Sequence, residues 1–185
     1  MEDQWVNMVN MITEEDLMEL IYFPGANRAQ SNHGVDLVVK SPCLSKSRIH
    51  SISYSFWDGS DPDIDSIIDE INSPNYTFDL CVGRSVGALV CLEAISRNII
   101  RAEKLLLFGL PLNLCEEVGV SRTNLVSIIQ EYPALIIQNI NDPVAILGEQ
   151  KNKISTKVCS FDRDDHLYVD FKAYEPFINS FIQSS

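Results

Sequence analysis

The chain contains a glycine–serine–glycine pattern, GRSVG at residues 83–87, between two apolar segments of different character. Residues 76–82 form a short run that suits a strand, whereas residues 88–95 form an apolar run typical of a buried helix. Glycines on both sides of Ser85 let a strand and a helix approach closely at a sharp turn. The pattern therefore predicts strand, turn and helix, with the Ser85 hydroxyl at the corner. Because glycine and serine are common, the five residues alone also fit an ordinary loop.

Two polar residues that could act together with Ser85 follow later in the chain, each in a loop after a predicted strand. Residues 134–140 form a short apolar run with β-branched residues, and the run ends at Asp142, before a proline. Residues 156–161 form another short strand, and a polar loop leads from it to His166. The chain therefore presents a serine, an aspartate and a histidine in that order.

Strand-like and helix-like segments alternate along the rest of the chain. The other expected strands lie at residues 20–23, 48–56 and 104–108. The other expected helices lie at residues 29–41, from Asp61 and Pro62 onward, at 121–131 and at 168–183, where Pro176 should kink or interrupt the helix. The alternation predicts an α/β fold with a mostly parallel sheet of about six strands and helices on both faces. Right-handed crossovers would then bring the three site loops to one edge of the sheet.

The length of 185 residues predicts a single domain over residues 1–185, in which residues 1–18 are ambiguous between a short helix and an edge strand. The formal charge of −12 at pH 7 argues against nucleic-acid partners, which require a basic surface. It also disfavours electrostatic attachment to anionic membranes, and no apolar run reaches the roughly 18 residues of a membrane span. The amino terminus is acidic and lacks a secretory n-region, so we expect a cytoplasmic protein.

The five cysteines of the chain fit that compartment. They show neither a C-x-x-C motif nor the Cys/His spacing of a zinc site. Cys81 and Cys159 fall in predicted strands and Cys91 in a predicted helix, where a free thiol acts as a small apolar side chain. We therefore expect free cysteines, no bound metal and no cofactor.

The order and placement of these residues resemble the α/β-hydrolase family. The segments that carry the resemblance are residues 23–26 (FPGA), 83–87 (GRSVG), 135–143 and 165–166 (DH), and together they span most of the chain. The G-R-S-x-G variant is similar to small, lid-poor hydrolases of the dienelactone-hydrolase and prolyl-peptidase branches. Many relatives have His-Gly where this chain has Pro24-Gly25, which is a departure from the family pattern. The resemblance implies a three-layer α/β-hydrolase fold.

The chemistry of such a site needs a nucleophile, a base and an acid together. Ser85 would attack a carbonyl, His166 would take the hydroxyl proton, and Asp142 would orient the histidine and stabilise the imidazolium. The negative oxygen of the tetrahedral intermediate needs two backbone donors. One should be the N–H of Val86, the residue after the nucleophile. The resemblance implies Ala26 as the second donor, a role that the departure at residue 24 leaves open.

Each site residue also has a purely structural alternative. Asp142 could be only a turn former, and His166 could be a solvated surface residue. The acidic residues that could replace Asp142 as the partner of the histidine are Asp162, Asp164 and Asp165. His33, expected in a loop or at a helix start, and His50, expected in a strand, fit the role of the base less well.

The sequence thus predicts a serine hydrolase that cleaves a small carboxylic ester or thioester through an acyl-enzyme. Residues 110–121, where larger relatives insert a lid, are too few to form one, which favours a small soluble substrate. A monomer or small homo-oligomer is the default expectation. The alternative is a non-catalytic binding or scaffold protein that keeps the α/β-hydrolase fold. A nucleotide-binding Rossmann-like module is disfavoured, because no G-x-G-x-x-G follows the first predicted strand.

Overall fold

The computed structural model describes residues 17–26, 42, 44, 46–58, 63–71 and 76–184. Several sequence predictions lie outside the described residues. They are most of the ambiguous segment 1–18, the helix at 29–41 with His33, Cys43, and the Asp61-Pro62 helix start.

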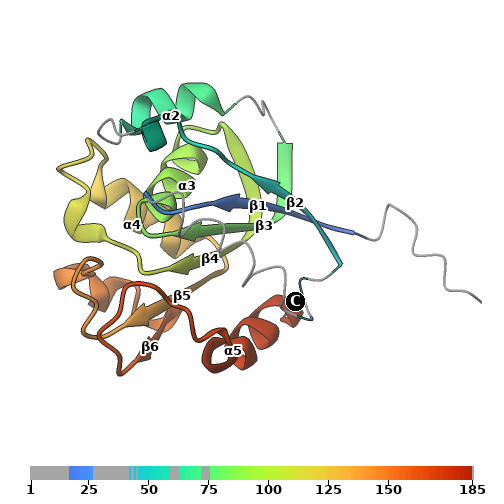
Figure 1. The fold of residues 1–185 in the computed structure, drawn as a ribbon, viewed down its shortest axis with the longest axis vertical. Helices are drawn as coiled ribbons and strands as arrows, with labels where there is room; N and C mark the ends of the chain where they lie inside the picture. Colours follow the sequence, from blue (N-terminus) through green and yellow to red (C-terminus); the bar gives the residue numbers. More distant parts are fainter. Residues whose placement is uncertain are drawn as a thin grey trace, which may run out of the picture.

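A sheet of six parallel strands forms the centre of the described chain, in the order β2-β1-β3-β4-β5-β6 (Figure 1). The strands are β1 Met18–Phe23, β2 Ser47–Ser51, β3 Tyr76–Arg84, β4 Ile100–Phe108, β5 Ala134–Asn139 and β6 Val158–Phe161. All five neighbouring pairs are parallel, which confirms the predicted sheet. Because the strands run in one direction, the loops at their carboxyl ends share one edge of the sheet.

Helices cover both faces of the sheet, as predicted (Figure 1). One face carries α2 Ile64–Glu70, α3 Val86–Ser96 and α4 Arg122–Glu131, and the other carries α5 Phe171–Gln183. Side chains of β1 alternate between the two cores: Ile21 and Phe23 pack toward the first three helices, and Leu20 and Tyr22 pack toward α5. The apolar run of β1 is therefore buried on both sides, as is typical of a central parallel strand.

Helix α3 is buried on every side. Residues 86–95 are all buried, including Glu93, whose carboxylate accepts a hydrogen bond from Arg97 Nε at 2.7 Å. A helix that is apolar around its whole circumference can only lie in the interior. The segment after the GRSVG pattern therefore forms the central helix of the larger core.

Strand β2 is shorter than the predicted strand at residues 48–56. Its pairing with β1 ends where Tyr22 faces Ser51, because β1 itself ends at the next residue, before Pro24. The chain then forms a 3₁₀-helix at Ser55–Asp58. Tyr54 and Phe56 are buried there with their rings stacked, 4.9 Å between centroids. Their burial, rather than strand pairing, accounts for the apolar residues in this part of the sequence.

Strand β4 and helix α5 also differ from the predictions. Strand β4 begins at Ile100 instead of Lys104, because its first residues pair with the start of β3 at Tyr76. Helix α5 begins at Phe171 and continues through Pro176 without interruption. Proline removes one backbone donor from the helix. Buried side chains on both sides of it, Tyr174 and Ile178, hold the helix against the sheet.

The bounds of the remaining helices and strands differ from the predicted ones by a few residues. Asp63 caps α2, and its carboxylate accepts a hydrogen bond from the Asp65 N–H at 3.1 Å. Ser121 caps α4 in the same way through Asn124 N–H. Strand β6 begins at Val158, after a 3₁₀-helix at Ser155–Lys157. Two further 3₁₀-helices lie at Leu112–Leu114 and Gly148–Lys153.

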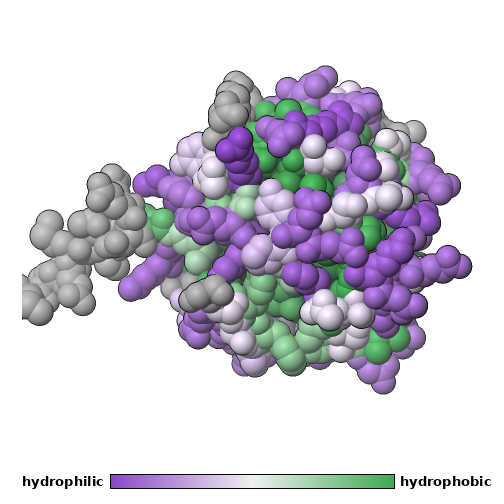
Figure 2. Space-filling view, turned by 180° about the vertical axis from the view of Figure 1, so that it is seen from behind, coloured by the Kyte–Doolittle hydropathy of each residue, from purple (hydrophilic) through white to green (hydrophobic). Residues whose placement is uncertain are grey.

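The face shown in Figure 2 is mostly hydrophilic, with apolar side chains in patches between the polar ones. The exposed large apolar side chains of the described chain are Tyr76, Ile140, Val144, Ile146, Leu167, Val169 and Phe177. Five of these, all except Tyr76 and Phe177, follow β5 or β6. Exposed apolar groups therefore gather in the two loops that also carry Asp142 and His166.

The turn between β3 and α3 brings two backbones into direct contact. A Cβ atom on Gly87 would lie 2.1 Å from the carbonyl oxygen of Pro24 and 2.2 Å from that of Phe23. A Cβ atom on Gly83 would lie 2.6 Å from the Cα atom of Ala88. Both positions require glycine, because the atoms that a Cβ would meet belong to the backbone and cannot move aside as a flexible side chain could.

Replacing Gly87 by alanine should lower the free energy of unfolding by about 3 kcal/mol or more, since the added methyl group meets fixed backbone atoms. Gly119→Ala is the matched control, because its Cβ would meet nothing within 4 Å and only its positive φ of 76° opposes the change. Urea denaturation of both variants measures the difference. Equal losses in the two variants would contradict the close approach at Gly87.

Candidate active site

Ser85 occupies a strained corner between β3 and α3. Its backbone angles are φ 53° and ψ −128°, which residues with a side chain rarely adopt. Such a conformation costs about 1–3 kcal/mol and persists only where the surroundings impose it. Here the Ser85 N–H donates to the carbonyl oxygen of Phe108 at 2.9 Å, and α3 begins at the next residue. The strand ladder on one side and the buried helix on the other fix the turn.

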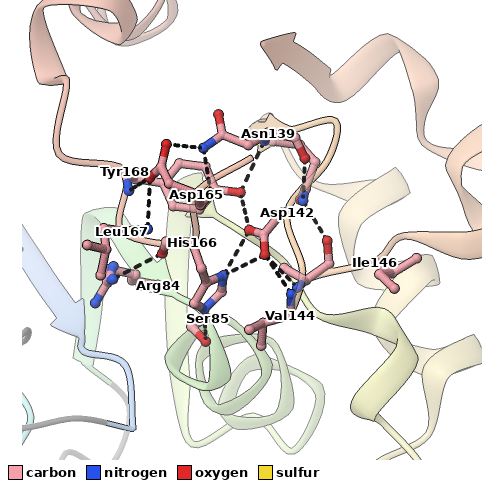
Figure 3. Close-up of polar contacts among 12 residues, drawn as sticks. Arg84, Ser85, Asn139, Asp142, Val144, Ile146, Asp165, His166, Leu167 and Tyr168 are labelled. Atoms are coloured by element: carbon pink, nitrogen blue, oxygen red, sulfur yellow. Dashed lines mark hydrogen bonds and ion pairs between the residues drawn. The ribbon is translucent and has the colours of Figure 1, made fainter. Parts of the chain in front are cut away.

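The structure brings Ser85, His166 and Asp142 together (Figure 3). His166 Nε2 lies 2.8 Å from Ser85 Oγ, and His166 Nδ1 lies 2.9 and 2.8 Å from the two carboxylate oxygens of Asp142. An ionised carboxylate can only accept hydrogen bonds, so it fixes the proton on Nδ1. Nε2 is then the acceptor for the Ser85 hydroxyl. The three side chains thus form a continuous hydrogen-bonded line from a hydroxyl through an imidazole to a carboxylate, an arrangement that can transfer a proton from the serine to the histidine.

The Asp142 carboxylate is buried and fully hydrogen-bonded. Besides His166, its oxygens accept from the N–H groups of Val144 and Ala145, both at 2.9 Å, and from the hydroxyl of Tyr168 at 2.8 Å. Burial raises the pKa of Asp142, but these hydrogen bonds outweigh it, and the pKa lies below its ordinary value. The group is therefore ionised at neutral pH.

Tyr168 is a site residue that the sequence analysis missed. It is 2% exposed and has a positive φ of 54°. Its hydroxyl donates to Asp142 and accepts from the Asn139 N–H at 3.1 Å. Burial raises the pKa of Tyr168, and the hydrogen bond to the Asp142 carboxylate raises it further, so the hydroxyl remains a donor. Gly109 leaves room for the ring, because a Cβ there would lie 2.6 Å from Tyr168 Cε2.

Asp165 shapes the histidine loop instead of contacting the imidazole. Its Oδ1 accepts from the N–H groups of Leu167 and Tyr168, both at 2.9 Å. The Asn139 side chain donates to the Asp165 carbonyl at 2.8 Å and to its carboxylate at 3.3 Å. Asp162, another alternative, accepts from the Asn141 side chain. Among the described residues, the carboxylate that contacts His166 is that of Asp142.

The loop after β1 lies beside Ser85. A Cβ on Gly25 would stand 3.6 Å from Ser85 Cβ, within ordinary contact distance. Tyr54 Oη donates to the Pro24 carbonyl at 3.0 Å, and Trp57 Nε1 donates to the Gly25 carbonyl at 3.4 Å. These two aromatic residues, which the sequence analysis did not connect with the site, hold the loop in place. Ala26 is exposed at the end of the described part of this loop.

Val86, the residue after Ser85, is the first residue of α3. The N–H groups in the first turn of a helix have no carbonyl partner within the helix. They also lie at the positive end of the helix dipole. The Val86 N–H belongs to this first turn.

No family model matches the chain, and no curated protein matches its sequence. Solved structures do match it over most of its length. The esterase domain of a Rhodothermus marinus protein matches with a TM-score of 0.62 at 10% identity, covering 92% of this chain and 88% of that one. Mouse alpha/beta hydrolase domain-containing protein 10 gives a TM-score of 0.57 at 11% identity, covering 89% of each chain. A lipase-esterase related protein from Clostridium acetobutylicum gives 0.58 at 12% identity, covering 88% of this chain and 93% of that one.

The chain has the α/β-hydrolase fold. The six-stranded parallel sheet and the structural matches together confirm the fold that the sequence resemblance implied. At 10–12% identity these matches show the fold alone, because one fold can carry many different reactions.

His50 and the described cysteines, which the sequence analysis also considered, lie in surroundings that explain them by packing and hydrogen bonding. His50 Nε2 lies 2.7 Å from a carboxylate oxygen of Glu19, and its ring packs against Tyr76 and Phe78 on the sheet. Cys81, Cys91 and Cys115 are buried free thiols, and Cys159 is a half-buried one. Within the described ranges, no group of three or more His, Cys, Asp or Glu side chains is arranged to hold a metal ion. The helices of the described chain are also too short or too polar to cross a membrane.

Replacing Tyr168 by phenylalanine should lower the free energy of unfolding by about 1–3 kcal/mol, because Asp142 loses a donor and the buried Asn139 N–H loses its acceptor. Tyr76→Phe removes a hydroxyl from a 43% exposed side chain and serves as the control. Urea denaturation at pH 7 compares the two. A Tyr168 variant as stable as the control would show that its hydroxyl does not support the site.

The low pKa of Asp142 predicts a pH-dependent contribution to stability. A carboxyl whose pKa is lowered by folding stabilises the protein above its unfolded pKa, near 4, and loses this effect as the pH falls through the folded value. The stability difference between wild type and Asp142→Asn should therefore be largest at neutral pH and should shrink below about pH 4. Denaturation at a series of pH values measures it, with Asp69→Asn on the exposed side of α2 as control. A difference that is constant with pH would contradict the assignment.

Proposed function

We propose that this protein is a serine hydrolase that cleaves a small carboxylic ester or thioester through an acyl-enzyme. One observation carries the proposal, the unbroken line of contacts from Ser85 Oγ through the His166 ring to the Asp142 carboxylate, each of 2.8–2.9 Å. The strained backbone of Ser85 and the esterase neighbours in the structure comparison support it.

In the proposed mechanism, Ser85 Oγ attacks the substrate carbonyl while its proton passes to His166 Nε2. The tetrahedral intermediate collapses, the bond from the carbonyl carbon to the alcohol oxygen or thiol sulfur breaks, and His166 returns the proton to the leaving group. Water then attacks the acyl-enzyme with His166 again as the base. The carboxylic acid leaves, and the Ser85 hydroxyl is restored. Asp142, ionised and buried, stabilises the imidazolium that forms in each half of the reaction.

We assign the oxyanion hole to the backbone N–H groups of Val86 and Ala26. The position of Val86 at the start of α3 and the contact of the Gly25 loop with Ser85 support this assignment. Backbone donors fixed at the site of developing charge need no reorganisation during the reaction.

Two features favour a small substrate with an apolar part. The segment after β4 is short, and its Leu110 and Leu112 side chains are fully buried in the core, so it forms no lid. The loops of Asp142 and His166 expose Val144, Ile146 and Leu167. An acyl or alkyl group bound against these side chains would lose contact with water.

The composition of the chain supports a proposal about its partners and its location in the cell. The formal charge of −12 disfavours nucleic acids and anionic membranes as partners. We propose a cytoplasmic monomer or small homo-oligomer whose partner is the small-molecule substrate.

A fluorophosphonate probe tests the nucleophile directly. Wild type should become covalently labelled, and Ser85→Ala should not, because the probe reacts only with an activated serine. Ser160→Ala, which removes an exposed serine on β6, is the control and should be labelled like wild type. With a series of chromogenic esters and thioesters of increasing acyl length, Ser85→Ala should lose at least about 1,000-fold in kcat. Folded wild type that no probe labels would instead favour the non-catalytic binding or scaffold protein.

A further inference from the structure

Arg84, the residue before Ser85, is buried beneath the histidine loop. It is the last residue of β3, and only 5% of it is exposed. Arginine keeps its positive charge inside proteins, and burial of a charge is costly unless partners compensate for it. Among the described residues no carboxylate oxygen lies within 4.0 Å of its guanidinium, and its Nε has no hydrogen-bond partner. Within the described part of the chain, Arg84 is therefore not held by an ion pair.

The guanidinium lies between two loops of the candidate site. Its Nη2 donates to the main-chain carbonyl of His166 at 3.2 Å (Figure 3). Its Nη1 lies 3.3 Å from the point where a Cβ on Gly25 would stand, so the absent side chain of Gly25 leaves room for it. Arg84 thus reaches from the strand of the nucleophile to the backbone of the base, next to the loop that carries Ala26.

The other polar anchors of the histidine loop lead to a different strand. Asp165 is bound by the Asn139 side chain, and the Tyr168 hydroxyl binds Asp142 and the Asn139 N–H. Both partners belong to β5 or to the loop after it. Apart from the contact of the imidazole with Ser85 itself, the hydrogen bond from Arg84 is the polar contact in the described chain that ties this loop to β3. The hydrogen bond from Arg84 therefore helps to set the distance between His166 and Ser85.

Several groups act on the charge of Arg84. Burial lowers its pKa, while Tyr22, Tyr168, Asp142 and Asp165 act electrostatically to raise it. Asp142 contacts the His166 ring, and Asp165 is the residue before His166 in the same loop. The buried cation thus offsets the negative charge that these two carboxylates bring to the loop.

We propose that Arg84 is a positioning residue, which holds the His166 carbonyl so that the imidazole stays within reach of the Ser85 hydroxyl. The inference rests on the proposed serine-hydrolase function. Because the guanidinium is covered, it does not contact substrate and acts through His166 alone. Its removal should therefore slow the chemical step and leave substrate binding nearly unchanged.

Steady-state kinetics on an ester that wild type cleaves measure the effects on the chemical step and on substrate binding separately, as kcat and KM. Arg84→Met should lower kcat by about 100-fold, the effect of a small misplacement of a catalytic group, with little change in KM. Arg84→Lys keeps a charge and a donor and should recover part of kcat. Arg97→Met removes an arginine that pairs with Glu93 and Asp65 at the end of α3; it should lower stability, because Glu93 is buried, but the folded variant should keep the wild-type kcat and KM. An unchanged kcat in folded Arg84→Met, or no recovery with lysine, would overturn the proposal.

A second measurement does not depend on turnover. His166 Nε2 accepts the Ser85 hydroxyl, so its nitrogen NMR shift reports the contact between base and nucleophile, and Ser85→Ala gives the shift without that hydrogen bond. In Arg84→Met the shift should move toward the value of Ser85→Ala, because the loop is no longer held to β3, and in Arg84→Lys it should stay near the wild-type value. The same shift in wild type and Arg84→Met would overturn the role of Arg84. Failure of fluorophosphonate labelling in wild type would overturn the hydrolase instead, so the two failures are distinguishable.

Discussion

The direct contact of helix α3 with the end of β1 at Gly87 determines the geometry on which the candidate site depends. The carbonyl oxygens of Phe23 and Pro24 occupy the space that any side chain at this position would need. With the helix so close to the sheet, the chain must reverse within one residue, and Ser85 takes the strained backbone conformation. The same contact places the loop after β1 beside the Ser85 side chain. A packing requirement of the core thus generates both the strained corner at Ser85 and its neighbouring loop.

The sequence predicted those parts of the fold that depend on local patterns. The strand, glycine turn and buried helix around Ser85 follow one another directly in the sequence, so the local hydrophobic pattern and the turn residues are enough to predict them. Asp142 and His166 could be placed after strands because each follows a short apolar run. Since all strands are parallel, placement after a strand also fixes the edge of the sheet at which the residue lies. The catalytic roles of the three residues remain a prediction that the geometry supports.

The parts that could not be predicted depend on contacts between distant residues. Tyr168 meets Asp142 across 26 positions, and Arg84 meets His166 across 82. A tyrosine in an irregular loop and an arginine between a glycine and a serine carry no local signal for such contacts. The strand predicted at residues 48–56 was too long for a related reason. Tyr54 and Phe56 are buried with their rings stacked on each other, and Tyr54 is hydrogen-bonded to the loop after β1; alternation alone does not distinguish this arrangement from a strand.

The short outer strands have a consequence for how copies of this protein behave at high concentration. Unpaired backbone groups along the outer strand of a sheet can bind a strand of another molecule and start aggregation. Here the two outer strands, β2 and β6, have only five and four residues. Arg48 projects from β2 with 46% of its side chain exposed and pairs with Glu19 on β1. Both outer strands are short, and β2 is also charged, so they offer little length for intermolecular strand pairing and the long apolar strands stay protected at the centre of the sheet.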